Sequence, residues 1–194
     1  MWQWWLIPFS YLLGSLSSAV IVSRILRLPD PREQGSKNPG ATNVLRLGGK
    51  KAAIITLLGD TAKGLIPLVV ANNVGATAGV LAACGLGAFL GHLYPVFFGF
   101  KGGKGVATAL GVLLGFSWVT GLAALLTWLA VAFLSRVSSL AALVSAALAP
   151  FYVWFWLKSP VLVAATLLMS GLLIWRHREN IGRIRRGEEA RIGR

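Results

Sequence analysis

The sequence has few charged residues. Only 13% of its 194 residues are charged and 56% are hydrophobic, whereas soluble globular domains carry about 25% charged residues. This shortage excludes an ordinary soluble domain. A single cysteine, Cys84, excludes an internal disulfide, and the two histidines and six acidic residues are too scattered to form a cluster of metal ligands. The sequence therefore predicts neither a bound metal nor a cofactor.

The hydrophobic residues are gathered in long runs with almost no charge. A helix needs about 20 apolar residues to cross a hydrocarbon layer about 30 Å thick. Runs of this kind lie at about 3–23, 52–71, 75–98, 137–157 and 160–176. Too little chain remains between the runs for a separate soluble domain. We therefore expect a single integral-membrane domain over residues 1–194, all-α in structure.

The run from Val106 to Leu134 is too long for one upright span and too short for two of ordinary length. The basic residues decide between these readings. With two short helices hinged near Gly115–Trp118, every lysine and arginine except Lys63 and Lys158 falls on one face. Cytoplasmic loops are enriched in these residues, so we predict seven transmembrane helices with the N-terminus outside and the C-terminus inside. The net charge of +13 then reflects membrane topology, and no nucleic acid is expected as a partner.

One pair of opposite charges lies inside a predicted span. Asp60 and Lys63 are three residues apart, which places them on the same side of a helix. Charges inside a membrane are costly and often mark a functional site. A structural ion pair between helices explains them almost as well.

Three polar, glycine-rich segments fall on the predicted cytoplasmic face. The first runs from Gly35 to Arg46, and its Gly, Ser, Thr and Asn residues combine small polar side chains with a flexible backbone. Successive backbone N–H groups in such a segment bind anions. A turn-rich connector explains the same composition, because these residue types dominate any loop.

The second segment runs from His92 to Thr108, where a glycine run with two lysines leads directly into a predicted helix. Helix N-termini with a nearby lysine bind phosphate readily. A Walker A motif is excluded, because three residues instead of four separate Gly99 from Gly103 and no Ser or Thr follows Lys104. The segment predicts a phosphate site without nucleotide hydrolysis. His92 itself is expected to be a satisfied structural histidine.

The third segment is the basic tail from Arg176 to Arg194. A basic tail after a last span commonly anchors to anionic lipid. His177 and Asn180, however, share one helix face if the last helix continues through them. A fourth inner loop at 136–139 is too short to interpret alone.

Taken together, these segments resemble the motifs of the bacterial acyl-phosphate-dependent glycerol-3-phosphate acyltransferases, small seven-span proteins of the inner membrane. The family pattern Gly-Ser-Gly-Asn-x-Gly-Ala-Thr-Asn-x-x-Arg matches residues 35–46, with Lys37 in place of the second glycine. The second motif matches residues 91–108 and the C-terminal motif residues 176–183. A weaker motif corresponds approximately to residues 138–140.

The resemblance implies transfer of a fatty acyl group from acyl phosphate to the 1-hydroxyl of glycerol 3-phosphate, giving lysophosphatidic acid and phosphate. It also implies a multi-pass protein of the bacterial inner membrane whose active site faces the cytoplasm. Acyl phosphate, glycerol 3-phosphate and membrane lipid are the expected partners. A transporter or exchanger of a phosphorylated solute is the alternative, but it would show paired halves and broken helices at mid-membrane. A lipid-binding scaffold is a further alternative, but it would not require two anion-binding loops.

The expected roles follow from the motifs and the chemistry. Acyl phosphate is already activated, so direct displacement needs no covalent enzyme intermediate. Basic neighbours should lower the pKa of His177, so we expect the substrate phosphate to act as the base. The expected catalytic residues are Lys104, His177 and Asn180. The expected substrate-binding residues are Ser36, Asn38, Gly40, Thr42, Asn43, Arg46, Lys101, Gly102, Gly103, Ser138 and Ser139.

Overall fold

The computed structural model describes residues 2–192, and this part of the chain is built from helices and their connections. In chain order the helices are the 3-10 helix η1 (Trp2–Trp5), α1 (Leu6–Gly14), α2 (Ser18–Ile25), α3 (Ala41–Asn73), α4 (Ala78–Leu93), the 3-10 helix η2 (Val96–Phe98), α5 (Val106–Phe116), α6 (Trp118–Ser135), α7 (Ser138–Leu157), α8 (Pro160–Arg176) and α9 (Arg178–Arg185). The predicted all-α class is confirmed. Arg194, at the end of the basic tail, lies outside the described residues.

Several helices are long and apolar enough to cross a membrane. Four meet this criterion directly: α3, α4 together with η2, α6 and α7. Two bent pairs, η1–α1 with α2 and α8 with α9, meet it when each pair is taken as one span. α5 is apolar but has only 11 residues. The described chain thus holds four to six candidate spans and one shorter apolar helix, and the count of seven remains a prediction.

The first predicted span is not continuous. A bend of 43° separates α1 from α2, where Ser17 is extended with φ −81° and ψ 95°. The run predicted as a span over residues 3–23 is therefore two helices with a bend between them, which together remain one candidate span. The run is uniformly apolar, so its hydrophobicity does not reveal the break.

The predicted hinge between α5 and α6 is confirmed. Ser117 is extended with φ −163° and ψ 133°, and its hydroxyl accepts a hydrogen bond from the N–H of Val119 to cap α6. The two helices are nevertheless unequal. α6 has 18 residues and reaches ordinary spanning length, whereas the 11 residues of α5 extend only about 16 Å at 1.5 Å per residue. Of the two helices predicted to be short, only α5 is short, and the prediction is wrong for α6.

Small residues let the helices pack closely. A Cβ added at Gly14, Gly91 or Gly111 would collide with a backbone carbonyl oxygen of a neighbouring helix. These contacts bring α1 against α4 and α3 against α5. In membranes, where lipid is as apolar as the side chains, such close backbone approach is a main source of helix association.

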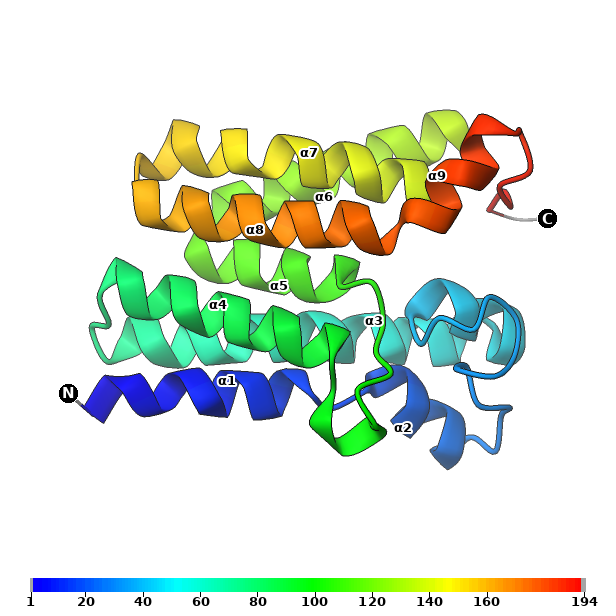
Figure 1. The fold of residues 1–194 in the computed structure, drawn as a ribbon, viewed down its shortest axis with the longest axis horizontal. Coiled ribbons are helices and arrows are strands. Elements are labelled where there is room, and N and C mark those ends of the chain that lie inside the picture. Colours follow the sequence, from blue (N-terminus) through cyan, green and yellow to red (C-terminus); the bar gives the residue numbers. More distant parts are fainter. Residues whose placement is uncertain (1, 193–194) are drawn as a thin grey trace.

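The polar connections gather at one end of the bundle (Figure 1). The segment between α2 and α3, the turn between α6 and α7, and helix α9 lie at this end, opposite the N-terminus. α5 starts short of this end, so the segment that joins η2 to α5 reaches into the bundle. This arrangement brings residues distant in sequence together around the start of α5.

Candidate active site

The second and third predicted segments meet directly. The ammonium group of Lys104 donates a hydrogen bond to the side-chain oxygen of Asn180. The guanidinium group of Arg176 donates to the carbonyl oxygen of Gly102 over 2.9 Å. Because Lys104 and Gly102 precede α5 whereas Arg176 and Asn180 belong to α8 and α9, these two bonds tie the glycine-rich loop to the C-terminal helices.

A carboxylate that sequence reasoning did not select lies at the centre of this network. Glu189 accepts hydrogen bonds from the amide of Asn180, from the hydroxyl of Ser139 over 2.8 Å and from the guanidinium of Arg183 over 2.7 Å. Burial would raise the pKa of Glu189, but the bonds from Asn180, Ser139 and Arg183 outweigh it and lower the pKa below its ordinary value. The sequence feature that could have identified Glu189 is its acidic side chain within a strongly basic tail.

The first segment reaches the same site through two contacts. The hydroxyl of Thr42 lies 3.5 Å from that of Ser138. A Cβ added at Gly103 would lie only 2.9 Å from the carbonyl oxygen of Pro39, so the two glycine-rich segments are in close contact. Thus all three motifs and the start of α7 at residues 138–139 come together, as the sequence predicted.

The first segment is also less loop-like than expected. The loop part of this segment ends at Gly40, the N-cap of α3. Thr42, Asn43 and Arg46 therefore lie in the first turns of a helix. The buried amide of Asn43 donates to the carbonyl oxygens of Pro31 and Gln34 over 2.9 and 3.0 Å. These bonds hold the preceding loop in shape, while direct contact of Asn43 with a substrate stays a prediction.

Other residues of the first two motifs face outward. Ser36, Thr42, Arg46 and Lys101 are exposed, and Asn38 is half-buried. The backbone N–H of Ser36 donates to the side-chain oxygen of Asn43 over 3.0 Å. The exposed side chains are therefore accessible to a water-soluble ligand.

The loop before α5 is buried. Gly102, Gly103 and Gly105 are all buried, and Gly105 has φ +88° and caps α5, a conformation that favours glycine. The N–H of Gly103 donates to the carbonyl oxygen of His92 over 3.2 Å. This donor is already partnered, so its predicted role in binding an anion remains untested and the main positive group of the loop is Lys104.

Two titratable groups of the site have lowered pKa values. Burial, followed by the nearby Arg183 guanidinium, lowers the pKa of Lys104 below its ordinary value, although Glu189 opposes this shift. Burial, together with Lys104, lowers the pKa of His177 to about 4. The ring Nδ1 of His177 lies 2.8 Å from the carbonyl oxygen of Leu173. His177 is therefore neutral at pH 7, with Nδ1 carrying the proton and Nε2 unprotonated.

The last helix does not continue through His177. This residue is the C-cap of α8, and a bend of 57° separates α8 from α9. The condition under which His177 and Asn180 were predicted to share one helix face, a last helix that continues through them, is therefore not met. Both side chains are nevertheless buried, at 3% and 6% exposure, and both lie at the bend.

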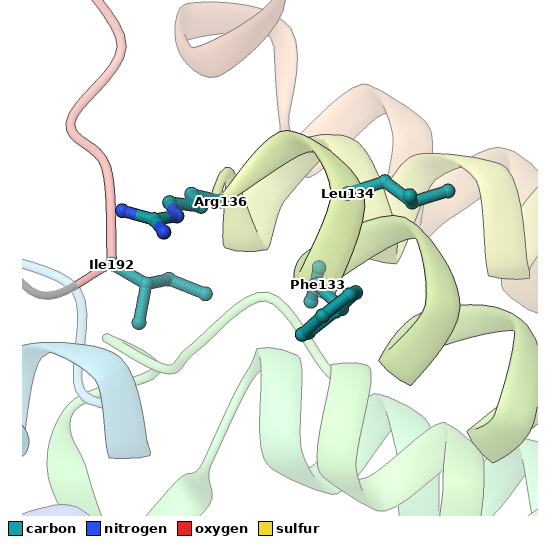
Figure 2. Close-up of a pocket in the computed structure, with 5 residues that line it drawn as sticks. Phe133, Leu134, Arg136 and Ile192 are labelled. Carbon is teal, nitrogen blue, oxygen red and sulfur yellow. The ribbon is translucent and has the colours of Figure 1, made fainter.

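An open hollow lies beside the site, between the end of α6 and the tail (Figure 2). It is lined by Ala132, Phe133, Leu134, Arg136 and Ile192. The backbone N–H of Ile192 donates to the carbonyl oxygen of Arg136 over 2.7 Å, which fixes the returning tail. The hollow is mainly apolar, and the hydrogen-bonded network of Lys104, Asn180 and Glu189 forms a separate feature.

Comparison with known proteins gives a consistent result. The sequence profile described as glycerol-3-phosphate acyltransferase matches residues 4–187. The chain belongs to the glycerol-3-phosphate acyltransferase family. A family member from Methylococcus capsulatus is 69% identical over 191 residues, covering 98% of this chain and 96% of the relative. Another from Thioalkalivibrio sulfidiphilus is 59% identical over 184 residues, covering 95% and 91%.

Solved structures extend this similarity to the fold. The glycerol 3-phosphate form of PlsY, an integral membrane glycerol 3-phosphate acyltransferase, superposes with a TM-score of 0.94 at 40% identity. The comparison covers 100% of this chain and 96% of that structure. A lysophosphatidic acid form gives a TM-score of 0.91 at 39% identity. The family assignment supports an integral, multi-pass membrane enzyme over a transporter or a scaffold.

Proposed function

We propose that this glycerol-3-phosphate acyltransferase takes its acyl group from acyl phosphate and transfers it to the sn-1 hydroxyl of glycerol 3-phosphate. The products are lysophosphatidic acid and inorganic phosphate. The observation that carries the proposal is the hydrogen bond between Lys104 and Asn180. It joins the glycine-rich loop to the C-terminal motif beside the buried His177, at the polar end of the bundle.

The charge of this region suits the two substrates. Each carries a phosphate group, and this end of the bundle supplies cations from several elements, including Lys104, Arg176 and Arg183. The acyl chain requires contact with lipid, whereas glycerol 3-phosphate arrives from water. PlsY has been solved in a glycerol 3-phosphate form and a lysophosphatidic acid form, which supports the same acceptor and product for this chain.

We assign one phosphate to each glycine-rich segment. One cradle combines the small polar side chains of the first motif with the N-terminal turn of α3, which has no side-chain cap and where the helix dipole favours an anion. The second surrounds Lys104. The first cradle comprises Ser36, Asn38, Gly40, Thr42 and Asn43, the second comprises Arg46, Lys101, Gly102, Gly103 and Lys104, and Ser138 and Ser139 complete the wall between them.

The reaction is a direct displacement. The sn-1 oxygen attacks the carbonyl carbon of acyl phosphate, a new ester bond forms, and the carbon–oxygen bond to phosphate breaks. The electron pair of that bond leaves with the phosphate. Lys104, oriented by Asn180, stabilises the negative charge that develops during this step, a type of contribution that often dominates enzymatic acceleration. Positioning of the two substrates supplies much of the rest.

The proton of the attacking hydroxyl passes to a substrate phosphate. With a pKa of about 4, His177 is a weak base, whereas the second pKa of a phosphate monoester is near 6. The unprotonated Nε2 of His177 instead accepts a hydrogen bond from the hydroxyl and orients it. The rate should therefore fall about tenfold per pH unit below about pH 6, where the phosphate takes up its second proton.

The membrane orientation follows from the basic residues. We propose seven spans, with α5 as the shortest, the N-terminus outside and the C-terminus inside. Apart from Lys63 and Lys158, the lysines and arginines of the sequence belong to segments at the active-site end under this topology, and such residues are retained in the cytoplasm. The active site then faces the cytoplasm across the bacterial inner membrane.

The decisive experiment supplies purified protein in detergent with synthetic acyl phosphate and glycerol 3-phosphate, and measures the release of phosphate and the formation of lysophosphatidic acid. Wild-type protein should form both products in equal amounts, and only when glycerol 3-phosphate is present. Lys104→Ala should lose most turnover, whereas Lys158→Ala, which removes an exposed lysine of the α7–α8 turn, should retain it. Absence of product from folded wild-type protein would overturn the proposal.

A second experiment tests the base. The pH profile of kcat should show an inflection near pH 6 and none near pH 4, and His177→Gln should keep measurable turnover with the same inflection. If His177→Gln abolishes turnover while fold and binding of glycerol 3-phosphate are unchanged, the base is His177.

A further inference from the structure

A buried polar cluster lies beneath the glycine-rich loop. Asp60 and Lys63 of α3 form an ion pair of 2.8 Å between the carboxylate and the ammonium group. The imidazole Nδ1 of His92, near the end of α4, lies 3.7 Å from the same carboxylate oxygen. All three residues are at most 7% exposed. The mechanism described above uses none of them.

The cluster touches the loop through His92. The carbonyl oxygen of His92 accepts the N–H of Gly103 over 3.2 Å. The imidazole lies so close to the same residue that a Cβ at Gly103 would collide with Nε2. A Cβ at Gly102 would likewise collide with the carbonyl oxygen of His92. Ring and backbone of His92 therefore support the two residues that precede Lys104.

The cluster also reaches the break between α1 and α2. The ammonium group of Lys63 donates to the carbonyl oxygen of Leu16 over 2.7 Å, at the break between α1 and α2. Lys63 and Leu16 line a groove between these helices and α3. One ion pair thus links the α1–α2 break, α3 and the end of α4. Through His92 it continues to the loop that carries Lys104.

Stability alone is a poor explanation for this arrangement. Buried ion pairs often stabilise a fold no better than apolar residues of the same volume, because desolvation offsets the attraction. Among the described residues, Asp60 Oδ1 and His92 Nδ1 both lack a geometrically good hydrogen bond. His92 is therefore not the satisfied structural histidine expected from the sequence. Charged residues retained inside a membrane protein at such cost are often functional.

We propose that Asp60, Lys63 and His92 are positioning residues for the acyl-transfer reaction. They hold the backbone of Gly102 and Gly103 and thereby set the position of the Lys104 ammonium. This inference rests on the proposed function, because it assigns Lys104 to the transition state. Loss of the cluster should then lower kcat, whereas the affinity for substrates should change little, since the groups that bind them remain present.

The test measures kcat and KM for glycerol 3-phosphate per folded molecule, with the folded fraction determined by size-exclusion chromatography and thermal unfolding. His92→Gln should lower kcat on the order of 10- to 100-fold, the effect expected when a catalytic group is misplaced by about 1 Å. The paired variant Asp60→Asn/Lys63→Met removes both charges together and so avoids an unpaired buried charge. It should also lower kcat.

Ser170→Ala provides the matched control. Ser170 is buried in α8 and its hydroxyl donates to the carbonyl oxygen of Ala146 over 2.7 Å. Its removal should reduce thermal stability and leave kcat per folded molecule unchanged. If His92→Gln and the paired variant behave like this control, the cluster is only structural and the inference is overturned.

A double-mutant cycle identifies the route of the effect. In a Lys104→Gln background, followed with radiolabelled glycerol 3-phosphate, His92→Gln should cost less than about threefold, because the group it positions is absent. If His92→Gln lowers kcat as much in the Lys104→Gln background as in wild-type protein, the inference is overturned. Wild-type protein without turnover would overturn this inference together with the proposed function. If wild-type protein turns over and the kcat of His92→Gln is unchanged, this inference alone is overturned.

Discussion

The two glycine-rich segments of the candidate active site are similar in composition and different in surroundings. The segment around Ser36 lies at the surface and is held by the amide of Asn43. The segment around Gly103 is buried and is held by His92 and Arg176. A surface loop with one brace can adapt to a ligand that arrives from water. A buried loop braced on both sides keeps its lysine in one place, as charge stabilisation requires.

The largest difference should come from the lysines of the second segment. Lys104→Met removes a half-buried ammonium held by Asn180 and should lower kcat by about 10²- to 10³-fold. Lys101→Met removes an exposed ammonium three residues earlier, and should cost less than about tenfold because exposed charges interact weakly. The rate of phosphate release measures kcat for both variants. Equal losses would show that the two lysines act alike and would contradict the comparison.

Glycine substitutions should separate the segments further. Gly103→Ala drives a Cβ into His92 and against Pro39, and should lower kcat about 100-fold by shifting the loop about 1 Å. Gly40→Ala meets only the Asn38 side chain at 3.1 Å, and should cost less than about threefold because that side chain can move. The comparison uses kcat per folded molecule. A Gly40→Ala loss as large as that of Gly103→Ala would mean that both segments are rigid.

Asn43, whose amide holds the surface segment in shape, should matter mainly for stability. Asn43→Ala leaves the carbonyl oxygens of Pro31 and Gln34 without their donor, and an unpartnered buried group such as that of Pro31 costs about 1–3 kcal/mol. The unfolding midpoint should fall by about 2–12 °C. Asn38→Ala, which removes a half-buried amide from the same segment, should shift it by less than about 2 °C. A wild-type midpoint for Asn43→Ala would contradict this role.

The smallest effect is expected at the ion pair between Asp30 and Arg32, 2.6 Å apart and partly exposed. Arg32→Met should cost no more than about 1 kcal/mol at pH 7. The side-chain hydrogen bond from Arg32 lowers the pKa of Asp30 below its ordinary value of 3.8. The pair therefore contributes above about pH 4 and loses its contribution as the pH falls through the lowered pKa. Thermal midpoints of variant and wild type should converge below pH 4, and a constant gap would contradict this.

Much of the architecture was predictable because its causes are local. The shortage of charge predicts a membrane protein, and the length of the run from Val106 to Leu134 predicts a hinge, which occurs at Ser117. The motifs predict which segments meet, and Lys104 does contact Asn180. These features depend on composition, run length and residues that recur in family motifs.

The remaining features depend on contacts between distant residues. The break near Leu16 receives a hydrogen bond from Lys63 of another helix, and the partner of the Gly103 N–H is the backbone of His92. Neither contact leaves a pattern in the neighbouring sequence. The same holds for Glu189, whose partners lie on α7 and α9. The bend at His177 escaped prediction because the residues on both sides are good helix formers.

The shortness of α5 has a consequence for where the two proposed reactants would meet. A helix of 11 residues leaves roughly half of a hydrocarbon layer about 30 Å thick uncovered along its own axis. Under the proposed function, the glycine-rich loop before α5 takes up the remaining depth, and Lys104 would lie where a hydrated solute arrives from the aqueous side and a fatty chain arrives sideways. Neither compound would then have to leave its own phase, and the ester formed there would already have its tail among lipids while phosphate escapes to water.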